Sequence, residues 1–246
     1  LGTVGVGQNL TVTTGGALTD SGAVTVAGLG TIVSTGFDVT LGDSTTANFG
    51  SLDFSGAAVS ITEASAMEVA ASEATGALTL VASGAVTQSG AIDADSTASV
   101  TAGANAITLT NAGNDFTGAV SLSNSGSNDV ALTDANALDL GTVGVGQNLT
   151  VTTGGALTDS GAVTVAGLGT IVSTGFDVTL GDSTTANFGS LDFSGAAVSI
   201  TEASAMEVAA SEATGALTLV ASGAVTQSGA ICLLYTSPSP RDWLQS

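Results

Sequence analysis

Carboxylates are the only ionisable side chains available for chemistry over most of this chain. Residues 1–231 contain Asp and Glu but no Lys, Arg, His or Cys. Two carboxylates can serve glycoside hydrolysis as acid and base, and the closest pair is Asp93 and Asp95 in the sequence DAD. Cleavage of acidic polysaccharides usually also needs a cation to hold the substrate's carboxylate. We therefore interpret the pair as a solvated turn and expect no catalytic residue and no enzyme activity.

Five aspartates in turn-like sequences are weak candidates for calcium ligands: Asp20, Asp43, Asp115, Asp129 and Asp134. If such side chains stack in columns, their oxygen atoms can bind a hard cation. The sequence contains neither an EF-hand loop nor the calcium nonapeptide GGxGxD. Dispersed, solvated acids are thus the default interpretation, and we expect no cofactor other than this weak calcium candidate.

The glycine-rich sequence GTVGVGQN at residues 2–9 has the texture of a phosphate loop. It lacks the lysine that such a loop needs, and no helical sequence follows it. We interpret it as a turn.

The charge balance excludes several classes of partner. The chain has 21 acidic residues and one basic residue, Arg241. Binding to nucleic acid needs clustered Lys and Arg, so we expect no nucleic acid partner, and attraction to an anionic membrane surface is equally disfavoured. No apolar run is long enough to predict a membrane-spanning segment. The acids keep the chain soluble and self-repelling.

The last fifteen residues differ in composition from all the others. Cys232, Tyr235, Arg241, Trp243 and both prolines are the only residues of their types, and all follow Ile231. The segment CLLYTSPSPRD resembles the translation of a transposon-type sequencing adapter. We therefore interpret residues 232–246 as an artefactual tail that packs onto nothing, and we expect the natural protein to have no cysteine.

Internal repetition divides the rest of the chain. Residues 140–231 are identical to residues 1–92, so that Leu140 repeats Leu1 and Ile231 repeats Ile92. The sequence thus predicts one full repeat unit at 1–139 and a truncated second copy at 140–231. The duplication is either genomic or an error of sequence assembly.

Short alternating triads recur inside the unit, with apolar residues on either side of Thr, Ser or Asp. Examples are Leu10-Thr11-Val12, Val24-Thr25-Val26, Val39-Thr40-Leu41, Leu78-Thr79-Leu80 and Ile107-Thr108-Leu109, and we expect their ten flanking residues to be buried. Alternation with a period of two indicates strands whose flanking residues point inward, and the joints between triads are rich in Gly, Asn, Asp and Ser. The absence of Pro before residue 238 and the long-range duplication favour stacked coils over a sandwich or a closed barrel.

We therefore predict an all-β parallel β-solenoid without native caps. Triads about 29 residues apart, such as Leu10 with Val39 and Leu78 with Ile107, suggest roughly five coils per unit, although about seven smaller coils fit the arithmetic too. Residues 62–76, TEASAMEVAASEATG, are rich in helix-forming Ala, Glu and Met. We expect irregular strand and loop there, with a short helix as the alternative.

The texture of NDFTGAVSLSNSGSNDVALTDANALDLGTV, followed by NLTVTTGGALTDSGAVTVAG, resembles the repeat regions of very large bacterial exoproteins of the filamentous-haemagglutinin-like and autotransporter-like adhesin type. The resemblance covers nearly all of residues 1–231. It implies a right-handed parallel β-helix on the surface of a Gram-negative bacterium or secreted from it. Attachment to surface glycans or proteins, or biofilm formation, is the implied role, and the secretion apparatus lies outside this segment.

The leading functional hypothesis is a non-catalytic stalk or repetitive contact surface of such an adhesin. The alternative is a carbohydrate-binding or carbohydrate-cleaving β-helix domain. A lateral groove with converging carboxylates favours the alternative, whereas uniform Thr, Ser and Asp faces favour the stalk.

Overall fold

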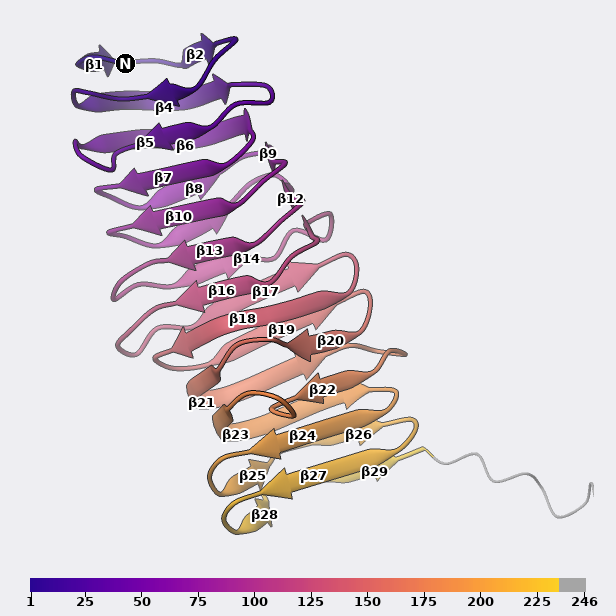
Figure 1. Ribbon diagram of the computed structural model, residues 1–246. Coiled ribbons are helices and arrows are strands. Elements are labelled where there is room, and N and C mark those ends of the chain that lie inside the picture. Colours follow the sequence, from indigo (N-terminus) through magenta and orange to yellow (C-terminus); the bar gives the residue numbers. More distant parts are fainter. Residues whose placement is uncertain (235–246) are drawn as a thin grey trace, which may run out of the picture.

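The alternating triads form the strands of a parallel β-solenoid of about twelve turns (Figure 1). The computed structural model describes residues 1–234. Within them every strand pairing is parallel, and no helix occurs. It follows that this part of the chain has no helix long and apolar enough to cross a membrane. The predicted fold class is confirmed.

The first repeat unit contains the following strands: β1 Val4–Val6, β2 Leu10–Thr13, β3 Leu18–Thr19, β4 Val24–Val33, β5 Val39–Leu41, β6 Ala47–Gly56, β7 Val59–Glu63, β8 Met67–Val69, β9 Ser72–Ala74, β10 Leu78–Ala82, β11 Val86–Gln88, β12 Ile92–Ala94, β13 Ala98–Thr101, β14 Ile107–Leu109, β15 Asp115–Phe116, β16 Val120–Ser123, β17 Val130–Asp134 and β18 Leu138–Val145, which crosses into the second copy. The second copy continues with β19 Leu149–Thr153, β20 Leu157–Asp159, β21 Val163–Val172, β22 Val178–Leu180, β23 Ala186–Gly195, β24 Val198–Glu202, β25 Met206–Val208, β26 Ser211–Ala213, β27 Leu217–Ala221, β28 Val225–Gln227 and β29 Ile231–Leu233.

The strand pairings fix the length of one coil. Leu78 of β10 pairs with Val59 of β7 on one side and with Ala98 of β13 on the other. The separation in sequence between two paired residues is therefore the length of one coil. The expected stacking of Leu10 on Val39 is therefore wrong, and Leu10 pairs with Gly30. Seven smaller coils make up each repeat unit. The predicted coil length was wrong because triads recur about twice per coil. Two triads that are one and a half coils apart therefore match in sequence although they do not stack.

The core register agrees with the prediction from alternation. Eight of the ten residues expected inside are buried: Val24, Val26, Val39, Leu41, Leu78, Leu80, Ile107 and Leu109. The other two, Leu10 and Val12, are only partly buried because their coil is packed on one side. Their counterparts in the second copy, Leu149 and Val151, have coils on both sides and are fully buried.

The helix-rich composition of residues 62–76 does not disturb the solenoid. This stretch contains the end of β7, all of β8 and all of β9, and Ser72, Glu73 and Ala74 alternate buried, exposed, buried. Strand and loop are present as expected, but the strands are regular and the alternative of a short helix is wrong, because stacking on both neighbouring coils outweighs the helix propensity of Ala, Glu and Met.

The start of the tail also departs from its prediction. Cys232 and Leu233 continue β29 and pair with Glu212 and Ala213 of β26. A parallel ladder needs only backbone N–H and C=O groups, so these two residues are held although their side chains are exposed. Tyr235 and the following predicted tail residues, including both prolines, Arg241 and Trp243, lie outside the described residues.

Candidate functional site

Three acidic residues from successive coils form one column. Glu73 of β9 pairs with Asp93 of β12, which pairs with Asp115 of β15. Adjacent strands lie about 4.8 Å apart, so three like charges stand in register. Such an arrangement is destabilising unless something compensates for it. Glu73 and Asp93 are exposed and Asp115 is partly exposed, which leaves the acidic column open to solvent.

The neighbouring charges of the acidic column affect the pKa of its central residue, Asp93. Partial burial is the first cause that raises the pKa of Asp93, and the charges of Asp95, Asp115 and Glu73 raise it further. Asp95 follows β12 directly and is exposed. The prediction of a solvated turn was wrong for Asp93, which lies in β12, and the DAD pair belongs to a larger acidic surface.

A shallow hollow borders the acidic column. It has a volume of about 360 Å³ and is lined by Asp53, Phe54, Ser55, Ala71, Ser72, Glu73, Ala91 and Asp93. Ser55 pairs with Glu73, so a serine occupies the next position of this column, inside the hollow. Partial burial raises the pKa of Asp53 as well. All three carboxyl groups of the hollow belong to residues of one stacked wall.

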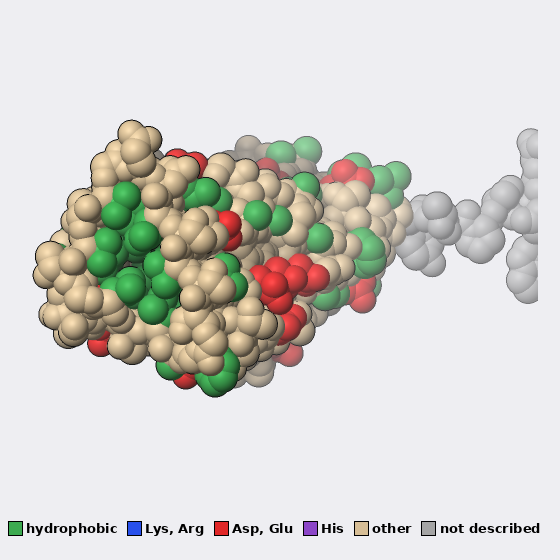
Figure 2. Space-filling view, turned by 90° about the horizontal axis from the view of Figure 1, so that it is seen from above, with side chains coloured by type: hydrophobic (Ala, Val, Ile, Leu, Met, Phe, Trp, Pro, Cys, Tyr) green, Lys and Arg blue, Asp and Glu red, His purple; other side chains and the backbone are tan. Residues whose placement is uncertain are grey.

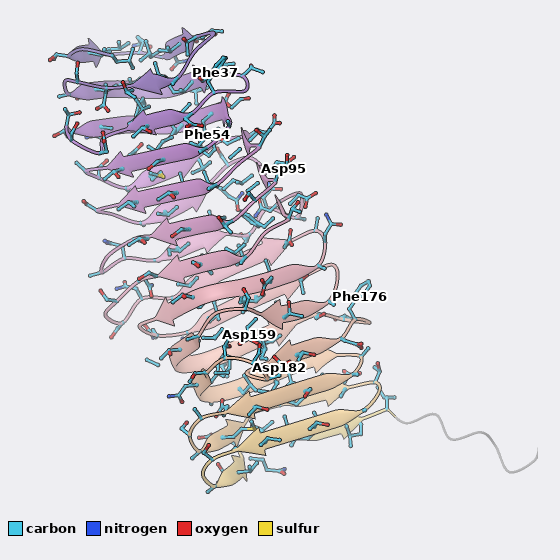
Figure 3. The ribbon with its side chains drawn as sticks, in the orientation of Figure 1. Phe37, Phe54, Asp95, Asp159, Phe176 and Asp182 are labelled. Carbon is cyan, nitrogen blue, oxygen red and sulfur yellow. The ribbon has the colours of Figure 1, made fainter. Side chains whose placement is uncertain are left out.

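An exposed aromatic side chain lies in the turn beside this hollow. Phe37 is 45 % exposed, whereas Phe49, Phe54 and Phe116 are buried. The Phe37 amide donates to Ser34 O at 2.9 Å, and Phe37 O accepts from the amide of Ala57 at 2.8 Å. Figure 3 shows Phe37, Asp95 and Phe176 along the same edge of the solenoid. The turn is therefore fixed to the coil that supplies Ser55.

The second copy repeats the hollow and the aromatic residue. A hollow of about 350 Å³ is lined there by Asp192, Phe193, Ser194, Ala210, Ser211, Glu212, Ala230 and Cys232. Phe176, the counterpart of Phe37, is 46 % exposed. Cys232 occupies the place that Asp93 has in the first copy, because the sequence identity ends at Ile231. The second hollow therefore lacks one carboxyl group.

A column on another part of the solenoid is neutral. Gly144, Thr164 and Asn187 pair in succession, with no carboxylate among them. Figure 2, which looks onto the coil of residue 1, shows hydrophobic side chains in the middle of that coil and a group of acidic side chains on one flank. Negative charge is thus distributed unevenly around the solenoid.

The five candidate calcium ligands do not form one cluster. Three of them accept a hydrogen bond from a backbone amide: Asp20 from Gly42 at 3.1 Å, Asp129 from Asn148 at 3.1 Å, and Asp134 from Phe116 at 3.2 Å. Asp43 is exposed, and Asp115 belongs to the acidic column. Within residues 1–234, no group of three or more candidate ligands is placed to hold a metal ion. The glycine-rich residues 2–9 form β1 and the turn that leads to β2.

One acidic side chain lies inside the core. Glu63, the last residue of β7, is 1 % exposed, and neither of its carboxyl oxygens has a hydrogen-bond partner. It pairs with Ala47 on one side and Ala82 on the other, whose small side chains leave room for it. Burial raises the pKa of Glu63 to about 8; the backbone of Phe49 lies close enough to lower this pKa in part, but it does not meet the geometry of a hydrogen bond. The side chain is therefore largely protonated at neutral pH.

Glu202 repeats this arrangement, and Asp134 shares the burial but pairs with Thr153 in place of an alanine. Glu202 is 1 % exposed between Ala186 and Ala221, and burial raises its pKa to about 7. Fewer coils cover Glu202 than Glu63, which accounts for the smaller shift. Asp134, at the end of β17, is also 1 % exposed, and its Oδ2 has no partner. Burial is the main cause that raises its pKa, and Asp115 adds to it.

The burial of Glu63, Asp134 and Glu202, which are called the inward acids from here on, was not predicted although a signal was present. Val59, Ile61 and Glu63 alternate with a period of two, which places all three on the same face of the strand. The helix propensity of residues 62–76 hid this register. Nothing in alternation alone distinguishes a buried acid from a register shift.

Four segments of the chain match one family, described as repeats of unknown function (DUF5649): residues 1–53, 56–123, 127–192 and 195–233. The chain belongs to this family. Comparisons with curated proteins and with solved structures give no match. The DUF5649 segments show that each repeat unit contains two family repeats.

Equivalent positions in the two DUF5649 repeats of a unit lie on opposite sides of the solenoid. VSITEASAMEV at 59–69 corresponds to VALTDANALDL at 130–140, and the first sequence returns at 198–208. β7 stacks with β10 and β13, whereas β17 stacks with β14 and β19 in the other sheet. Two family repeats share the seven coils of a unit, so each takes three and a half coils and begins half a turn away from the last. Glu63, Asp134 and Glu202 are then equivalent positions of three successive repeats.

Proposed function

We propose that this chain is a non-catalytic stalk, or repetitive contact surface, of a large adhesin that is secreted or held on the surface of a Gram-negative cell. The regular stacking of coils carries the proposal. Each strand pairs only with the coil above and the coil below, so the solenoid can gain length without any change to its core. The resemblance to bacterial exoprotein repeats supports the location and the role in attachment or biofilm.

The composition of the surface supports a role without chemistry. Outward positions such as Thr25, Thr40 and Thr79 are repeated hydroxyl side chains. Acid–base catalysis needs groups placed on both sides of the bond that breaks. The carboxylates of the acidic column and the hollow instead come from one wall of the solenoid. We therefore expect no hydrolysis of polysaccharides, measured as the release of reducing ends.

A stalk can be tested by its reach. Solenoids of one, two and four units are displayed on Gram-negative cells, each with the same small binding module at the outer end. Beads that carry the module's ligand beneath a polymer layer are then offered. Capture should rise with the number of units, because only a longer solenoid crosses the layer. Capture that is independent of unit number, with equal surface display, contradicts the proposal.

The hollow beside Phe37 supports a second candidate function, carbohydrate binding. An exposed aromatic ring can pack against the apolar face of a sugar, and carboxylates can accept hydrogen bonds from its hydroxyl groups. Ser34 of the turn that carries Phe37 donates its amide to Ser55 O at 2.8 Å, which holds this turn next to a residue of the hollow. Cleavage is the less favoured form of this function because the carboxylates share one wall.

The test of this second function compares Phe37→Ala and Glu73→Gln with Asp129→Asn on a glycan array. The control substitution removes the same charge as Glu73→Gln, but Asp129 lies in a turn remote from the hollow. Binding that falls in the first two variants and persists in the third supports a carbohydrate site. Equal binding by all three variants, or no binding by the unchanged chain, contradicts the carbohydrate site, and the stalk is then the one remaining proposal.

A further inference from the structure

The inward acids have no role in a stalk or in a contact surface, because solvent cannot reach them. Glu63, Asp134 and Glu202 recur at the same position of three successive DUF5649 repeats. Each is 1 % exposed, and five of their six carboxyl oxygens have no hydrogen-bond partner. An unpaired carboxylate in an apolar interior is one of the costliest groups a protein can bury. A purely structural core would place Val or Leu there.

We propose that these three inward acids form a pH-sensitive device, which lets the coils pack fully when the acids are protonated and loosens the coils around them when they ionise. The device recurs once per family repeat, alternately on the two sides of the solenoid. Ionisation therefore acts at several points along the chain and not at its ends alone.

The groups around each inward acid offer no compensating charge. For Glu63, the neighbouring β6 and β8 carry Asp53 and Glu68, while β5 and β10 carry no titratable side chain. Glu202 has the same surroundings, with Asp192 on β23 and Glu207 on β25, and none on β22 or β27.

Asp134 has Asp115 on β15 and Asp139 on β18, and none on β14 or β19. Every facing group among these elements is therefore an acid, which can only oppose ionisation.

The sign of the effect follows from proton binding. The usual pKa of a glutamate is 4.5, and burial raises it to about 8 for Glu63 and about 7 for Glu202. Between these limits the folded chain holds protons that the unfolded chain has lost, so stability falls as the pH rises. The unfolding constant of the affected coils should rise about tenfold per pH unit for each glutamate. Below pH 4.5 the effect is absent, and above pH 8 it is complete.

The experiment uses the full chain and a triple variant, Glu63→Gln, Asp134→Asn and Glu202→Gln. Amides have nearly the size and polarity of protonated acids, so the variant should match the unchanged chain at pH 5 and exceed its stability at pH 8. The control is Asp43→Asn, Asp95→Asn and Asp182→Asn. It removes the same charge from exposed side chains, none of which lies on a strand that packs against an inward acid.

Urea unfolding followed by circular dichroism at pH 5, 6, 7 and 8 gives the first readout. The second is the infrared carbonyl band of protonated carboxyl groups at pH 6, which the triple variant should lose and the control should keep. The proposal is overturned if the midpoint of the unchanged chain does not fall between pH 5 and 8, or if both variants flatten that fall equally. Absence of the infrared band from the folded, unchanged chain overturns it independently of stability.

Discussion

Adding one repeat unit should lengthen the solenoid by a fixed increment. The natural insertion is a second copy of residues 93–231 placed after Ile231, because residue 231 is equivalent to residue 92 and the register is kept. Seven strand pairings lead from Val39 to its counterpart Val178, by way of β7, β10, β13, β16, β18 and β20. At about 4.8 Å per coil, the increment is about 34 Å.

Small-angle X-ray scattering measures this increment directly. The maximum dimension should grow by about 34 Å for each inserted unit, at seven coils of about 4.8 Å, while the cross-sectional radius of gyration stays constant. Increments of about 24 Å would indicate five larger coils per unit and refute the register of the strand pairings. A cross-section that widens with unit number would mean separate globular units on linkers, and the stalk would have to be abandoned.

Three further outcomes follow from the packing. Leu80→Ala should destabilise the chain by about 2–5 kcal/mol, whereas Thr79→Ala, one residue away and facing outward, should cost less than about 1 kcal/mol in urea unfolding. Gly42→Ala should cost more than Gly36→Ala in melting temperature. Both glycines have φ near +75°, but a Cβ at Gly42 would meet Thr62 O at 2.0 Å while one at Gly36 meets nothing. Sodium chloride and calcium chloride at equal ionic strength should raise the melting temperature equally, because both screen repulsion among the carboxylates. A larger rise with calcium, reversed by a chelator, would show a specific site.

Local patterns predicted the strands but not how they stack. The triad Leu78-Thr79-Leu80 contains everything needed to place two side chains inside and one outside. Coil length is a different kind of information, because it depends on which triads meet across the sheet. Since a triad occurs about twice in each coil, a spacing of one coil and a spacing of one and a half coils both align apolar with apolar.

The acidic column could not be found for the same reason. Glu73, Asp93 and Asp115 follow one another at intervals of one coil, and only the correct coil length brings them into register. The inward acid Glu63 was missed because two rules conflicted: helix propensity spoke against a strand, and alternation required one. Neighbouring coils decide such a conflict, and they are invisible in a local window of sequence.

The half-turn between successive DUF5649 repeats sets direction as well as length. Phe37 and Phe176 are one whole unit apart, which is a whole number of turns, so both rings face the same edge (Figure 3). Duplication of a whole unit therefore lines up its surface features on one side, at intervals of about 34 Å. Duplication of a single family repeat would instead aim everything beyond it at the opposite side. A ligand that spans several units would bind with the gain of multivalency in the first case and lose it in the second. Whether a chain gains an even or an odd number of DUF5649 repeats is then a property on which selection can act.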